Sequence, residues 1–130
     1  MPSPRFASVP RQAYAVRMPD TATYADFDKL DIRVGTIVDA KVADGTHKPA
    51  IRLWIDFGPA LGVKTSSAQI TVHYKTDQLI GRQVLGVVNF APKRIGDFTS
   101  EVLTLGLPGD GEQVVLVRPD FVVPDGGRLY

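Results

Sequence analysis

Residues 32–42 alternate between apolar and other side chains with a period of two, the pattern of a long strand with one buried face. The side chains expected on the buried side are Ile32, Val34, Thr36, Val38, Ala40 and Val42. Gly35 lies inside the pattern, and a glycine within a strand commonly marks a bulge or a sharp bend. A long, half-buried strand with such a bend is the kind of strand that small β-barrels need.

Shorter patterns of the same kind follow. Further strands are expected over residues 51–57, 61–65, 84–90, 101–105 and 114–117, with a glycine-rich turn over 106–111. A short helix is expected over 24–30, where Thr23 and Asp26 form a capping box and Phe27 and Leu30 share a buried face. A second is expected over 68–74, behind a capping box that begins at Ser66. The expected elements are several short strands, with one helix between the third and the fourth strand and no βαβ series. This order predicts an all-β barrel of the OB-fold type.

The length of 130 residues and the hydrophobic content of 44% predict one globular domain. Residues 1–22 contain four prolines and no periodic pattern, so we interpret them as an extension, with the domain over 23–130. We interpret the segment from Pro119 to Tyr130 as an arm that packs on another surface. Without an apolar run long enough for a membrane span or a signal peptide, the expected location is the cytoplasm.

The residue types argue against catalysis. The chain has no cysteine, and its two histidines, His47 and His73, are far apart in sequence, so neither a metal site nor a cofactor is expected. We find no phosphate-loop or dinucleotide glycine motif and no catalytic triad. Asp97 and Glu101 lie close together, but the nearby Lys93 and Arg94 favour local charge compensation over acid–base chemistry. A non-catalytic protein is predicted.

Basic residues are concentrated in the middle of the chain, where residues 41–94 hold eight lysines and arginines against three acids. Within this region, Pro92 and Gly96 predict a loop that carries Lys93 and Arg94, with Asn89 and Ser100 beside it. The loop is either a phosphate-binding site or a solvated turn with incidental charges.

Two further features of the sequence allow two interpretations each. Ser66 and Ser67, close after Lys64, either cap the expected helix or also form an anion site at its first turn. Trp54, the only tryptophan, is predicted on the polar side of its strand. There it is either covered by the extension, a loop or a partner subunit, or used to stack on a ligand.

Five blocks of sequence together resemble the tRNA-binding OB-fold domain in its small stand-alone form, the CsaA type. The blocks are Asp28–Ile37, Lys48–Leu53, Ile55–Gly58, Ser66–Ile70 and Val87–Ile95. The resemblance implies a homodimeric binding module. Related domains hold tRNA when fused to methionyl- and phenylalanyl-tRNA synthetases, and the CsaA form is described as a chaperone in bacterial protein export. The implied partners are therefore tRNA, unfolded pre-proteins and the SecA translocation ATPase.

The positions that match the family's binding face, taken with the charge argument, define the expected site. The residues expected to bind RNA or another anion are Lys48, Lys64, Ser66, Ser67, Gln69, Asn89, Lys93, Arg94 and Ser100, and Glu101 belongs to the same pattern. The apolar residues expected at a peptide-binding or dimer face are Trp54, Phe90, Phe121 and Val122. Val102-Leu103 stands where tRNA-binding relatives tend to have Gly-Met, which fits the CsaA form. A chaperone, an RNA-binding module and a scaffold that acts with a synthetase all remain compatible with these motifs.

Overall fold

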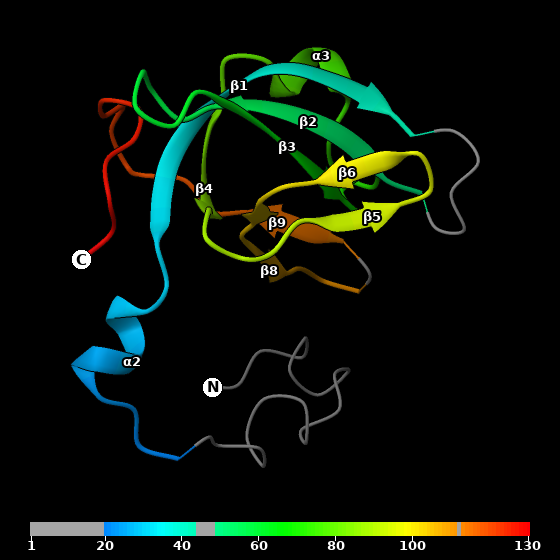
Figure 1. The fold of residues 1–130 in the computed structure, drawn as a ribbon. Helices are drawn as coiled ribbons and strands as arrows, with labels where there is room; N and C mark the ends of the chain where they lie inside the picture. The colour runs from blue at the N-terminus through cyan, green and yellow to red at the C-terminus, as the bar shows by residue number, and fades with distance from the viewer. Residues whose placement is uncertain (1–19, 44–48, 112) are drawn as a thin grey trace.

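The computed structural model describes residues 20–43, 49–111 and 113–130, and their strands form a nearly closed barrel (Figure 1). The helices are α2 (Tyr24–Asp28) and α3 (Thr76–Leu79). The strands are β1 (Ile32–Val42), β2 (Ile51–Asp56), β3 (Val63–Ala68), β4 (Gln83–Val87), β5 (Lys93–Ile95), β6 (Phe98–Ser100), β7 (Leu103–Thr104), β8 (Gly106–Pro108) and β9 (Val114–Leu116). The main sheet has the order β3-β2-β1-β4-β7, and β5-β6 and β8-β9 form separate pairs. The expected all-β barrel is confirmed.

The long strand β1 joins the two halves of the barrel by changing its partner. Its first half, Ile32–Thr36, pairs with β4, and its second half, Thr36–Val42, pairs with β2. Gly35 lies just before this change. A Cβ atom at Gly35 would lie 2.6 Å from Ile55 Cγ2 and 2.9 Å from the Asp56 carbonyl oxygen. The glycine is therefore required because the backbones approach too closely for a side chain.

The expected alternation in β1 is wrong in the middle of the strand. Ile37, expected on the open side, is completely buried, whereas Val38, expected on the buried side, is 45% exposed. The pairing of β1 with β2 shifts register between Ile37 and Asp39, which places the bulge at Val38 rather than at Gly35. After the extra residue Ala40 is buried as expected, but Val42, also expected on the buried side, is 60% exposed at the end of the strand.

Strand β2 supplies the centre of the core, and its predicted alternation is confirmed. Ile51, Leu53 and Ile55 are buried, and the side chains between them are partly exposed. Further core residues come from β1, α3, β4, β9 and the loops: Ile37, Phe57, Ile70, Leu79, Val84, Val102 and Leu116.

The barrel closes where β3 meets the chain just before β7. The backbone N–H groups of Glu101 and Val102 both donate to the Thr65 carbonyl oxygen, at 2.8 and 3.1 Å. On the other side, β8 pairs with β9, so the first half of the expected glycine-rich turn at 106–111 is a strand.

The helix expected over residues 68–74 does not form, although a helix does lie between the third and fourth strands. Ser66, Ser67 and Ala68 instead continue β3 and pair with Leu53, Arg52 and Ile51 of β2. Pairing with β2 therefore determines the structure of these residues, although their sequence resembles a helix cap. The helix α3 begins later, at Thr76, and only Leu79 in it is buried.

The capping box of α2 is confirmed, but its expected buried face is not. Thr23 N donates to Asp26 Oδ2 at 2.9 Å, and Asp26 N donates to Thr23 Oγ1 at 3.2 Å. The helix buries no residue, and Phe27 is 36% exposed. No helix in the described part of the chain is long and apolar enough to cross a membrane.

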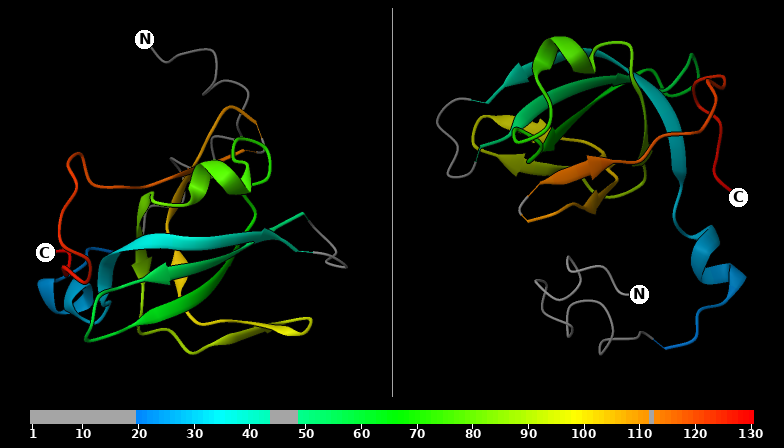
Figure 2. Two further views of the ribbon diagram at one scale, coloured as in Figure 1. Left: turned by 90° about the horizontal axis from the view of Figure 1, so that it is seen from above. Right: turned by 180° about the vertical axis from the view of Figure 1, so that it is seen from behind.

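The C-terminal arm lies along the first half of β1, on the same side of the barrel as α2 (Figure 2). Val34 exchanges backbone hydrogen bonds with Gly126 and Gly127, and Leu129 N donates to the Ile32 carbonyl oxygen. Arg128 Nη2 donates to the Asp28 carbonyl oxygen at 2.8 Å, which joins the arm to α2. The arm is therefore held by its own barrel.

Candidate RNA-binding pocket

The segment expected to loop around Lys93 and Arg94 is a β-hairpin. Lys93 pairs with Ser100 and Arg94 with Thr99, and Gly96, with φ at 63°, supplies the positive φ that the two-residue turn needs. The prediction of a loop is wrong because β5 and β6 pair with each other through backbone hydrogen bonds. The sequence alone did not indicate this pairing. Lys93 and Arg94 are nevertheless exposed.

The hairpin packs on the outer face of β2 through charged and aromatic contacts. Arg52 Nη2 lies 3.0 Å from Asp97 Oδ1, and its guanidinium carbon lies 4.9 Å from the centre of the Phe98 ring. Phe98 in turn meets Trp54 edge to face, with ring centres 5.8 Å apart. Trp54 is thus partly covered by a segment of its own chain, and Lys41 Nζ lies 5.7 Å from the centre of its ring.

Hydrogen bonds fix the hairpin's second strand and the residue after it against β3. Glu101 Oε1 accepts a hydrogen bond from Thr65 N at 3.0 Å and lies 2.9 Å from Thr65 Oγ1. Ser67 N donates to Ser100 Oγ at 3.1 Å. The Glu101 carboxylate is therefore held by the sheet rather than moving freely in solvent.

A pocket of about 620 Å³ lies between the hairpin, the end of β3 and the chain leading into β7. Its lining residues are Ala50, Ser67, Gln69, Phe90, Ala91, Lys93, Arg94, Ile95, Ser100, Glu101, Val102 and Leu103. Six of the residues predicted for binding are brought together here: Ser67, Gln69, Phe90, Lys93, Arg94 and Ser100. Among the described residues, Lys93 and Arg94 form no ion pair.

The register of β3 explains why Lys64 and Ser66 are not in this pocket. Lys64 pairs with Ile55 and Ser66 with Leu53, and paired residues point to the same side of a sheet. Both therefore face the core side, whereas Ser67, next in the chain, faces the hairpin. Ser66 is completely buried, and its Oγ accepts a hydrogen bond from Thr104 Oγ1 at 2.7 Å. Ser66 therefore contributes to the packing of the barrel and not to a helix cap.

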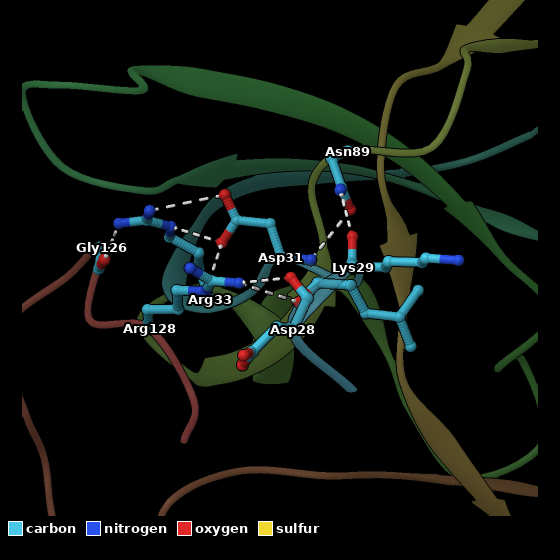
Figure 3. A network of polar contacts seen from close by, with 8 residues as sticks. Asp28, Lys29, Asp31, Arg33, Asn89, Gly126 and Arg128 are labelled. Carbon is cyan, nitrogen blue, oxygen red and sulfur yellow. Dashed lines mark hydrogen bonds and ion pairs between the residues drawn. The ribbon is translucent and has the colours of Figure 1, made fainter. Parts of the chain in front are cut away.

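Asn89 is also engaged in the fold, at the junction between α2 and β1 (Figure 3). Its Oδ1 accepts from Asp31 N at 2.9 Å, and its Nδ2 donates to the Lys29 carbonyl oxygen at 2.7 Å. In the same network, Arg33 and Arg128 both lie against the Asp31 carboxylate. The Asn89 amide therefore ties the end of β4 to the start of β1.

The remaining predicted site residues lie elsewhere. Phe121 and Val122 are on the arm, where they are 78% and 88% exposed. Lys48, like most of the extension at 1–22, falls outside the described residues. The apolar wall that Ile95, Val102 and Leu103 provide was missed, because it depends on the hairpin. In the sequence, Val102-Leu103 stood out only as a departure from tRNA-binding relatives and not as part of the site.

Comparison with known proteins agrees with this architecture. Residues 32–128 match the family model described as "Putative tRNA binding domain". The structure is similar to the chaperone CsaA from Bacillus anthracis str. Ames, with 47% identity and a TM-score of 0.80 over 85% of this chain and 99% of that chain. The CsaA chaperone protein from Picrophilus torridus is 47% identical, with a TM-score of 0.78 over 85% of this chain and 100% of that chain.

The curated relatives are longer proteins. The methionine–tRNA ligase of Christiangramia forsetii is 34% identical over 101 residues, which make up 78% of this chain but 14% of the ligase.

Proposed function

We propose that this chain, which belongs to the tRNA-binding domain family, is a non-catalytic module that binds tRNA at the pocket beside the β5–β6 hairpin. The observation that carries the proposal is the pair of exposed cations, Lys93 and Arg94, on a β-hairpin at a pocket that the polar side chains of Ser67, Gln69 and Ser100 also line. Phosphate contacts of this kind supply a large share of the affinity in nucleic-acid binding. If this function is correct, the protein partner would be a separate aminoacyl-tRNA synthetase, to which the module supplies tRNA binding in trans.

A second candidate function, a chaperone in bacterial protein export, has its own supporting observation. The same pocket has an apolar part, in which Phe90 is 47% exposed and Leu103 is 50% exposed. Unfolded pre-proteins would bind there by burying apolar side chains, with the SecA ATPase as a further partner. The similarity to two CsaA chaperones favours this candidate, and the cytoplasm is the compartment that both candidates require.

The salt dependence of ligand affinity distinguishes the two functions in the wild-type protein. We expect the affinity for tRNA to fall between 50 and 200 mM salt, with a slope of log affinity against log salt at least as steep as about −1.5, because two phosphate contacts contribute about 0.7 to 0.9 each. The affinity for an unfolded polypeptide, for example reduced and carboxymethylated α-lactalbumin, should barely change over this range. Fluorescence anisotropy measures both. Absence of tRNA binding at 50 mM salt would contradict the first function, and absence of polypeptide binding would contradict the second.

We also propose that the protein is a homodimer whose interface includes the C-terminal arm. Tyr24 and Phe27 on α2, together with Phe121 and Val122 on the arm, expose apolar side chains that the barrel does not cover. A stable interface of this kind buries more than about 2,000 Å² in total.

Light scattering after gel filtration at low micromolar concentration is expected to give about twice the chain mass of 14.1 kDa. Phe121→Asp with Val122→Asp should shift the protein to the monomer mass, because a charged group in an apolar interface is costly. Both side chains are exposed in the single chain, so circular dichroism should report an unchanged fold. A monomer mass for the wild type would rule out the dimer at that concentration.

A further inference from the structure

The Glu101 carboxylate gives the pocket a feature that phosphate binding does not explain. A carboxylate repels phosphate, yet this one lines the pocket that Lys93 and Arg94 also line. Its Oε1 is held by Thr65, and within the described part of the chain its Oε2 accepts no hydrogen bond. A fixed acceptor with one oxygen available is suited to a ligand that donates hydrogen bonds.

We propose that this pocket holds one unstacked guanine nucleotide, with Glu101 accepting hydrogen bonds from the base. The inference rests on the proposed RNA-binding function and adds the identity of the base. Guanine alone among the four RNA bases has two adjacent donors, N1–H and N2–H₂, on its Watson–Crick edge. Adenine and cytosine place an acceptor beside their amino group, and uracil places a carbonyl on each side of its N3–H. Oε2 has two lone pairs and can accept from guanine N1–H and N2–H₂ together, whereas on each of the other bases an acceptor beside the donor repels the carboxylate, so guanine is favoured.

The other lining residues fit the remaining parts of a nucleotide. Phe90 supplies an exposed aromatic ring on which a base can stack, and Leu103 supplies further apolar surface. Gln69, which is also exposed, carries an amide that can donate to guanine O6. Lys93 and Arg94 provide the charge for the phosphate. The pocket volume of about 620 Å³ lies within the range of small-molecule sites.

The test compares four fluorescein-labelled hexamers of uridine in which the third base is G, A, C or U. We expect the wild-type protein to bind the G hexamer between about fivefold and a hundredfold more tightly than the U hexamer. Glu101→Gln should reduce this ratio to below about twofold. Its amide oxygen can still accept from Thr65 N, while its NH₂ group presents a donor to the base.

Asp97→Asn is the matched control. It also removes a single negative charge, here from the turn of the hairpin, but Asp97 does not line the pocket. In Asp97→Asn the ratio of G to U affinity should stay at the wild-type value, although the loss of a negative charge raises its affinity for every hexamer. Thermal melts report whether each variant is folded. If Glu101→Gln does not fold, the four wild-type affinities decide the question alone.

The outcomes separate this inference from the function on which it rests. Equal wild-type affinity for the four hexamers, with tRNA still bound, would overturn the guanine pocket and leave the RNA-binding function in place. A preference for A, C or U would overturn it too, and a G preference that survives in Glu101→Gln would remove Glu101 from base recognition. If neither tRNA nor any hexamer binds, both proposals are wrong.

Discussion

Replacing Lys93 and Arg94 together by alanine is expected to make tRNA binding less sensitive to salt without unfolding the protein. Each phosphate contact contributes about 0.7 to 0.9 to the slope of log affinity against log salt, so the slope should become shallower by about 1.5. Between 50 and 200 mM salt, the wild type should therefore lose about eightfold more affinity than the variant. The binding of an unfolded polypeptide through apolar contacts should not follow this change.

The fold should survive because both side chains are exposed and their strand needs only the backbone. Among the residues that the structure describes, the side-chain hydrogen bond given up is that from Arg94 Nε to the Gly96 carbonyl oxygen, at 2.8 Å on the surface. Exposed substitutions of this type usually change the free energy of unfolding by no more than about 0.5 kcal/mol.

Lys75→Ala with Arg118→Ala is the matched control for this double variant. It also removes one lysine and one arginine, both of them exposed and neither in the pocket lining. Its salt slope should stay near the wild-type value. The same slope for the Lys93 and Arg94 variant and the wild type would remove these two residues from the RNA site. Equal loss of tRNA and of the unfolded polypeptide would mean that one surface serves both.

Much of the fold was predictable because its strongest signals are local. The alternation of β2 and the capping box of α2 each depend on residues within one element, and the structure has both. The signals that failed depend on partners far away in sequence. Ser66 and Ser67 are residue types typical of a helix cap, but they pair with Leu53 and Arg52 of β2. The strand pairing stabilises this segment more than a helix cap would.

Six of the residues predicted for binding line the candidate pocket, but their arrangement was not predictable. Ser67 and Ser66 are neighbours in sequence, yet one faces the hairpin and the other is buried, because side chains alternate along a strand. No local pattern indicates which of the two side chains faces outward. Similarly, the bulge at Val38 changes which side chains of β1 face the core, and its position follows from the pairing of β1 with β2.

The C-terminal arm depends on a close approach that only glycine allows, and Gly126→Ala is therefore expected to destabilise the protein strongly. Gly126 has a φ of 93°, which L side chains rarely adopt, and a Cβ atom there would lie 2.6 Å from the Phe57 carbonyl oxygen. The arm would have to move away from Phe57 and would strain the hydrogen bond from Gly126 N to the Val34 carbonyl oxygen, now 2.8 Å long. Positive φ and the clash together should cost about 2 kcal/mol or more.

Thermal unfolding followed by circular dichroism should show a melting temperature lower by roughly 6–10 °C for Gly126→Ala. Gly127→Ala, one residue further, is the matched control. Its φ is not positive, and its Cβ would meet the Pro124 carbonyl oxygen and Val34 Cγ1 at 3.6 Å, an ordinary contact distance. That variant should melt within about 2 °C of the wild type. If both variants melt like the wild type, the docking of the arm on β1 does not stabilise the barrel. If both lose stability equally, the loss is not specific to Gly126, and neither its positive φ nor the contact with Phe57 is the cause.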